Sequence, residues 1–237
     1  LIFIIIISSI SKISLSHEFW IDPENYNLKN KDIITAGVFI GDNFEGYQIA
    51  FSREYFKNLN LFSNNKKIKI KGRLGDFPAL NIKKTFKGLN IIQIESQMNY
   101  VNYENLTKFE VFSRQKGYRN LADKHRKNNY PESFVESYKR YAKSLVSVET
   151  FDGNDVDTNM ELELIFLDNP LKNLKKSKRV LLEYQNKILT DHKVSLMSFN
   201  NGYFRKEYVK TNKDGYFEYF FKNDTKYLIE SVVIIEG

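Results

Sequence analysis

The sequence predicts a mostly β protein made of two antiparallel β-sandwich modules with one connecting helix. Short segments rich in β-branched and aromatic residues recur along the 237 residues, separated by turn signals of Gly, Asn, Asp and Pro. Aromatic residues are abundant, with 19 Phe and 15 Tyr, and this bias fits strands better than helices. The length leaves room for one large or two small domains with an ample core.

The first module is expected over residues 17–150. Residues 66–71 alternate charged and apolar side chains with a period of two, as in a strand with one wet face. Residues 22–25 and 41–43 are turn signals that separate neighbouring strands. The remaining strands of this module are expected at residues 19–21, 32–40, 46–51, 89–97 and 107–114.

The connecting helix is predicted at residues 131–145, where a proline suits the first helical position. Phe134, Tyr138, Tyr141 and Leu145 fall at i, i+4, i+7 and i+11, which places them on one face of a helix. We expect this stripe to be buried as packing surface rather than to form a site.

The second module is expected over residues 159–237, after an irregular connection at residues 150–158. Asp214 and Gly215 stand between β-forming residues and predict a tight hairpin turn. A calcium loop starting at Asp152 is excluded, because the spacing does not give the required ligands and glycine. Strands of this module are expected at residues 160–167, 179–184, 192–200, 203–210 and 226–235.

Residues 1–16 are predicted to be a signal peptide, so the protein is expected to be periplasmic or otherwise exported. The apolar run at residues 1–7 is far shorter than the roughly 20 residues of a membrane span. Ser14 and Ser16 supply the small residues that a signal peptidase requires. Cleavage after Ser16 would make His17 the first residue, with an α-amino group and an imidazole that can chelate a divalent ion together. His17 is therefore the first-choice metal ligand.

Charge and composition narrow the possible functions. Lys and Arg number 36 against 29 Asp and Glu, a net charge of +7, but the excess is scattered among acidic stretches. Such a distribution predicts a solvated surface, so no nucleic-acid partner is expected, and no transmembrane span is expected in the mature chain. Cysteine is absent, which excludes disulfides, thiolate metal sites and thiol catalysis.

Motifs of known catalytic sites are missing from the sequence. It has no nucleophile elbow, phosphate loop, dinucleotide fingerprint or zinc-protease motif. Three histidines occur: His17, His125 in a basic segment, and His192 at a strand start. We expect no enzymatic activity and assign no catalytic residue; His125 is the second-choice metal ligand.

Four motifs carry a resemblance to a known family. They are residues 17–23 (HEFWIDP), 72–79 (GRLGDFPA), 136–146 (ESYKRYAKSLV) and 211–217 (TNKDGYF). In this order they resemble the DUF4198 family over nearly the whole mature chain. The resemblance implies export, two immunoglobulin-like or transthyretin-like β-sandwich modules, a link to nickel and cobalt uptake, and His17 as the metal-facing residue.

The leading hypothesis is a non-enzymatic, exported protein that binds Ni²⁺, with Co²⁺ or Cu²⁺ as other candidates, and acts with an inner-membrane metal permease. Nitrogen-rich sites bind copper most tightly in vitro whichever ion is biological. One alternative is a metal-free β-sandwich for adhesion or cell-envelope contact. A second is a copper-dependent oxidase with an N-terminal histidine brace, which needs His125 or His192 beside His17.

Overall fold

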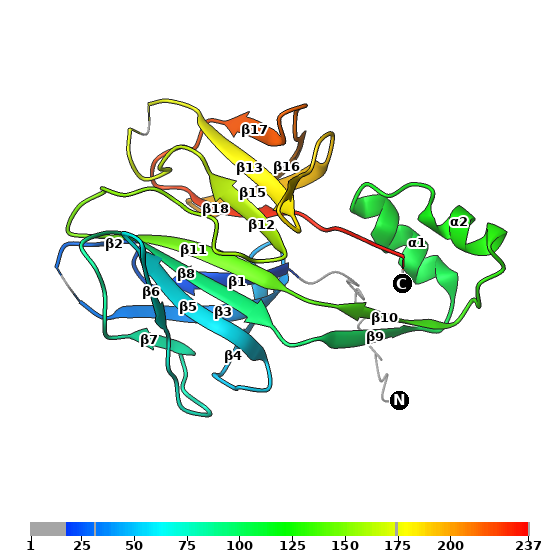
Figure 1. Cartoon of the computed structure of the whole chain (residues 1–237), viewed down its shortest axis with the longest axis horizontal. Helices are drawn as coiled ribbons and strands as arrows, with labels where there is room; N and C mark the ends of the chain where they lie inside the picture. Colours follow the sequence, from blue (N-terminus) through cyan, green and yellow to red (C-terminus); the bar gives the residue numbers. More distant parts are fainter. Residues whose placement is uncertain (1–17, 31, 174, 237) are drawn as a thin grey trace, which may run out of the picture.

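The computed structural model describes residues 18–30, 32–173 and 175–236. It confirms the predicted fold class: the protein is mostly β, with several small antiparallel sheets and two short helices (Figure 1). Within the described residues, no helix has the length and apolar character needed to cross a membrane.

The N-terminal strands form two sheets. One sheet has the order β1-β3-β4, with β7 beside β3, and the other has the order β2-β11-β8-β5-β6. All neighbours are antiparallel except the short β2, which runs parallel to β11. These strands are β1 (Glu18–Pro23), β2 (Asn27–Leu28), β3 (Ile34–Asp42), β4 (Glu45–Ile49), β5 (Phe56–Ser63), β6 (Lys66–Lys69), β7 (Leu80–Ile82), β8 (Gly88–Ser96) and β11 (Tyr141–Val148).

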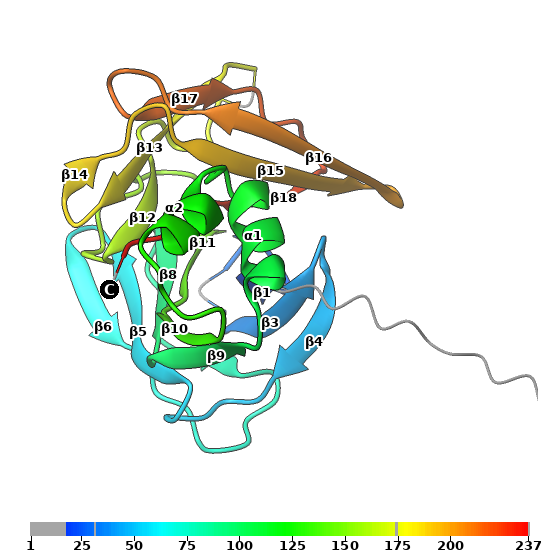
Figure 2. The same cartoon turned by 90° about the vertical axis from the view of Figure 1, so that its right-hand side faces the viewer.

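The two sheets enclose one hydrophobic core between them. Ala36 and Val38 from β3 and Ile92 and Val146 from the other sheet are fully buried in the same cluster. Alternate side chains of a strand point to opposite faces, so an alternating apolar pattern buries one face of each sheet. This arrangement places β1 and β11 next to the C-terminal part of the chain (Figure 2).

The C-terminal strands form two further sheets around a second core. Their orders are β12-β13-β14, with β17 beside β13, and β16-β15-β18. Val180, Leu182 and Phe217 from the first sheet pack with Val194 and Leu196 from the second. These strands are β12 (Leu162–Phe166), β13 (Lys178–Tyr184), β14 (Lys187–Ile188), β15 (Lys193–Asn200), β16 (Tyr203–Lys210), β17 (Tyr216–Tyr219) and β18 (Lys226–Glu230).

The Asp-Gly turn does not close a hairpin. Gly215 has the positive φ of +79° that such a turn requires, but the strands on its two sides belong to different sheets. β16 pairs with β15, whereas β17 pairs with β13. The predicted turn is confirmed and the predicted pairing is wrong, because a local turn fixes chain reversal but not the partner of the next strand.

The helix predicted at residues 131–145 is wrong. This segment forms β10 (Phe134–Tyr138) and the start of β11, and β10 pairs with β9 (Asn99–Tyr103). Phe134 and Tyr138 also alternate with exposed residues at a period of two, so the same residues satisfy a strand pattern. The aromatic side chains at 134, 138 and 141 are half-buried rather than enclosed.

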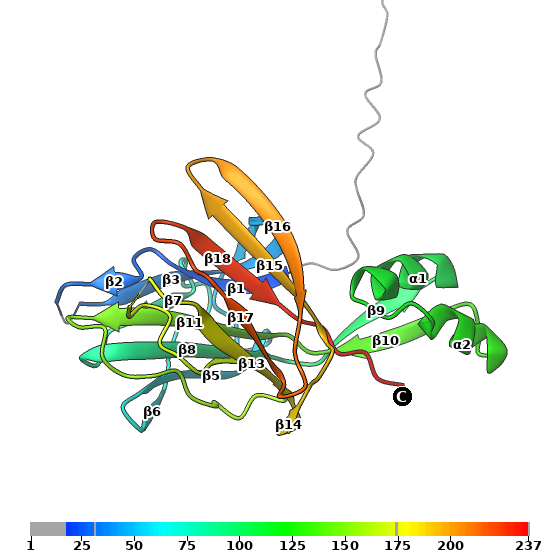
Figure 3. The ribbon, with the colours of Figure 1, turned by 90° about the horizontal axis from the view of Figure 1, so that it is seen from above.

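Both helices lie between β9 and β10 instead. β9 and β10 continue β8 and β11 as a ribbon, and α1 (Leu106–Gln115) and α2 (Leu121–Lys127) sit at its far end (Figures 1 and 3). The strand expected at residues 107–114 is therefore wrong. Asn105 caps α1 by accepting a hydrogen bond from Thr107 N at 3.1 Å, and Leu106, Phe109 and Phe112 repeat with helical spacing.

A tight contact at the start of β8 gives a stability prediction. Gly88 has φ of +94°, and a Cβ there would lie 2.6 Å from the Asp152 carbonyl oxygen, which accepts a hydrogen bond from Leu89 N. Gly88→Ala should lower the unfolding free energy by about 2 kcal/mol or more, measured by urea denaturation. Gly75→Ala is the control, because Gly75 also has positive φ but has open space around it. Equal losses for the two variants would contradict the predicted clash at Gly88.

Candidate functional site

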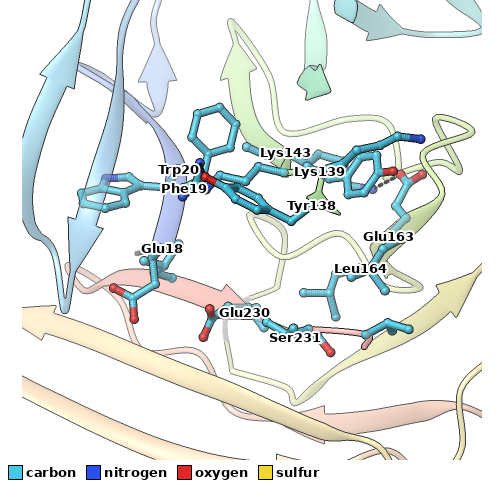
Figure 4. Close-up of a pocket in the computed structure, with 18 of the residues that line it drawn as sticks. Glu18, Phe19, Trp20, Tyr138, Lys139, Lys143, Glu163, Leu164, Glu230 and Ser231 are labelled. Atoms are coloured by element: carbon cyan, nitrogen blue, oxygen red, sulfur yellow. Dashed lines mark hydrogen bonds and ion pairs between the residues drawn. The ribbon is translucent and has the colours of Figure 1, made fainter. Parts of the chain in front are cut away.

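A large cleft lies where the N-terminal sheets, the C-terminal sheets and the helices meet. Its volume is about 1430 Å³, and its lining is predominantly apolar. β1 and β11 contribute one side, β12 and β18 another, and β10 with the helices a third. Buried charged side chains occur at two places in or beside this cleft, and Figure 4 shows residues from both.

The first place is at Glu18, the first residue of β1. Glu18 is only 3% exposed, and its carboxylate accepts a hydrogen bond from Asn43 N at 2.6 Å. Lys206 Nζ from β16 lies 3.3 Å from Glu18 Oε1. Burial, followed by the negative charge of Glu230, raises the pKa of Glu18 from 4.5 to about 7. This carboxyl group therefore titrates near neutral pH.

Glu230, the last residue of β18, supplies the second carboxylate. Its Oε1 lies 2.6 Å from Lys116 Nζ, at the end of α1. Its Oε2 is buried and has no hydrogen-bond partner within the described part of the chain. A buried carboxylate oxygen without a partner is costly, which makes it a feature that calls for an explanation.

Glu18 and Glu230 extend toward the same part of the cleft, as Figure 4 shows. Each has one lysine partner, so the set of Glu18, Glu230, Lys116 and Lys206 is formally neutral when all four are ionised. Two carboxylates that repel each other, one of them with a free oxygen, can accept a further cation. Oxygen donors of this kind bind divalent metal ions or ammonium groups.

The second place joins the two sets of sheets and was not predicted from the sequence. Lys143 from β11 lies 3.0 Å from Asp155 Oδ1 and 2.7 Å from Glu163 Oε1. All three side chains are at least nine-tenths buried. The other acceptor positions receive hydrogen bonds, from Thr158 and Met160 among others. Every carboxylate is thus satisfied, and this cluster serves to hold the structure together.

Of the two predicted metal ligands, the structure describes only His125. His17 lies outside the described residues, immediately before Glu18 in the chain. His125 is on α2, where its Nε2 lies 2.7 Å from the carbonyl oxygen of Pro131 and its ring packs against Phe134. No acidic side chain joins it there in the described contacts.

His192 also contacts a backbone carbonyl rather than an acid. Its Nε2 lies 3.1 Å from Val232 O, and burial lowers its pKa. Across the described ranges, no group of three or more His, Cys, Asp or Glu side chains is arranged to hold a metal ion. Glu18 and Glu230 are two such donors, and His17, the first-choice ligand predicted from the sequence, directly precedes Glu18 in the chain.

The fold and the site define a mostly β protein with two layered cores and a large cleft that carries a buried carboxylate pair. The chain matches a domain of unknown function, DUF4198, over residues 14–234, and it belongs to that family. No curated protein matches the chain.

Proposed function

We propose that this protein is exported and binds a divalent transition-metal ion, Ni²⁺ first and Co²⁺ or Cu²⁺ after it, as a non-enzymatic component of metal uptake. The observation that carries the proposal is the carboxylate pair of Glu18 and Glu230, in which Oε2 of Glu230 has no hydrogen-bond partner among the described residues. Glu18 is the residue that follows His17 in the chain. A permease of the inner membrane would be the receiving partner.

The donor set fits these ions. After cleavage behind Ser16, His17 would offer an amine and an imidazole nitrogen, and the pair would add carboxylate oxygens. Mixed nitrogen and oxygen donors suit Ni²⁺ and Cu²⁺ in tetragonal geometry, and also Co²⁺. Lys116 and Lys206 hold the carboxylates in place in the metal-free protein and compete with the ion for them.

Calorimetry on the protein that begins at His17 tests the proposal. NiCl₂ should bind at one strong site, and the affinity should rise between about pH 5 and pH 8 as the imidazole and the amine lose their protons. His17→Ala should abolish this site, and so should one glycine placed before His17. Glu230→Gln should weaken nickel binding by about tenfold, the value of one charged ligand.

His125→Gln is the matched control, because it changes a histidine of the same cleft and should leave nickel binding unchanged. If the protein with the added glycine binds nickel and copper as tightly as the one starting at His17, the N-terminal site does not exist. That result would favour the metal-free envelope protein. A site lost in both His17→Ala and His125→Gln would favour the histidine brace.

A further inference from the structure

Glu136 is an exceptional acid among those that line the cleft. Five other acids of the lining each have a lysine partner: Glu18 with Lys206, Glu161 with Lys139, Glu163 with Lys143, Glu230 with Lys116 and Glu236 with Lys124. Asp224 also lines the cleft, but its side chain is exposed to solvent. Glu136, on β10, has no basic partner within the described residues, and its Oε2 is buried without any hydrogen bond. Burial raises its pKa, and Tyr103 is the one neighbour that opposes this by hydrogen bonding.

Aromatic side chains surround this carboxylate. Glu136 shares one face of β10 with Phe134 and Tyr138, whose positions alternate with exposed ones. The Phe134 ring stacks on Tyr103 with centroids 5.0 Å apart. The Arg140 guanidinium lies 4.6 Å from the centre of the Tyr138 ring, so Tyr138 already has a cation on one aromatic face.

The stability of the free protein gives no reason for a partly buried carboxylate without a counter-charge at this position. A buried charge without a partner costs more than a neutral residue of the same shape would. Such a group persists in the lining of a cavity when a partner arrives from outside. With a volume of about 1430 Å³, this cleft is larger than most pockets for small molecules, so an organic ligand has room beside Glu136.

We propose that the cleft binds an organic ammonium compound with an apolar or aromatic body. The charged nitrogen pairs with the Glu136 carboxylate, and the body packs against Phe134 and Tyr138. The charge and the apolar walls both select this class: a neutral ligand leaves Glu136 unpaired, and an anion is repelled by it. The site uses neither His17 nor the pair of Glu18 and Glu230, so it can exist whether or not the proposed metal site does.

Three indole compounds of similar shape and different charge test this site: tryptamine, tryptophol and indole-3-propionate. Their binding to the whole protein is measured by calorimetry in buffer with a metal chelator. Tryptamine should bind at least about tenfold more tightly than the other two, as expected for one charge-assisted hydrogen bond. Glu136→Gln should remove this preference and leave tryptophol binding unchanged. Glu104→Gln, at an exposed position beside β9, is the control and should keep the preference.

Thermal unfolding separates the binding role from a structural one. Without ligand, Glu136→Gln should melt at the same temperature as the wild type or above it, because it removes an unpaired buried charge. Equal affinity of the wild type for the three compounds, or no tryptamine binding up to about 10 mM, would overturn the proposal. A fall in melting temperature of Glu136→Gln together with unchanged tryptamine binding would also overturn it.

Discussion

Replacing Lys143 with methionine is expected to destabilise the protein by about 3–5 kcal/mol at pH 7. The lysine is the cation in contact with Asp155 and Glu163, whose side chains are 0% and 1% exposed. Methionine keeps much of the volume but leaves two buried carboxylates without a counter-charge. Urea denaturation followed by the fluorescence of Trp20, the single tryptophan, measures the loss.

The loss in Lys143→Met should shrink as the pH falls toward 5. Burial raises the pKa of Asp155 and of Glu163 already in the wild type, and Lys143 is the main charge that opposes this. Without the lysine, both acids hold their protons in the folded state at pH values where the unfolded chain has released them. Because the folded state then binds more protons, its stability rises as the pH decreases through this window.

Lys139→Met is the matched control for this experiment. Lys139 also bridges the two sets of sheets, to Glu161 at 3.0 Å, but both side chains are about a third exposed. A pair of this kind contributes about 0–1 kcal/mol. If Lys143→Met loses no more stability than Lys139→Met, the buried cluster does not stabilise the junction.

The second large effect is a pH dependence of stability that comes from Glu18. The unfolding free energy of the metal-free protein should fall by an amount on the order of 2 kcal/mol between about pH 5 and pH 8. The pKa of Glu18 is about 7 in the folded state, against 4.5 for an unperturbed glutamate. Between these values the folded protein keeps a proton that the unfolded chain has lost, so raising the pH favours unfolding.

Glu18→Gln should remove the contribution of Glu18 to this slope, because glutamine does not titrate, so stability should fall less between about pH 5 and pH 8 in the variant than in the wild type. Glu161→Gln is the control of opposite sign. Hydrogen bonds from Gln185, Tyr141 and Lys139 lower the pKa of Glu161 from 4.5 to about 2. Its stabilising contribution is therefore present above pH 4.5 and is lost as the pH falls toward 2. Glu161→Gln should lack this contribution at neutral pH and approach the wild type in acid, with the slope between about pH 5 and pH 8 unchanged. An unchanged slope between about pH 5 and pH 8 in Glu18→Gln would contradict the assignment.

Local signals along the chain were enough to predict the β-rich fold class and many of its turns. Aromatic bias, period-two alternation at residues 66–71 and turn residues such as Asp214 and Gly215 are local signals, and the structure follows them. It also carried a signal for α1 that was missed, because Asn105 is a good helix cap and the apolar residues after it repeat every three. Local signals state which conformations a segment can adopt.

Where one residue pattern allowed two conformations, packing against distant strands selected one of them. Residues 134–145 fit a helical stripe and a strand equally well by spacing. β9 and β8 lie in register beside residues 134–145 and satisfy the backbone hydrogen bonds of this segment, which therefore forms strands. The partner of β17 was decided in the same way, by the sheet it reached and not by the turn before it.

The burial and pairing of the charged groups in the cleft depend on tertiary structure even more strongly than the choice between helix and strand. The sequence placed Glu18 beside His17, but Glu230 comes from the other end of the chain, and Lys143 meets Asp155 and Glu163 across a junction of sheets. The sequence shows that these residues are charged. Whether a charge is buried, paired or left without a partner depends on which distant segments fold around it, because desolvation and short-range contacts are properties of the packed chain.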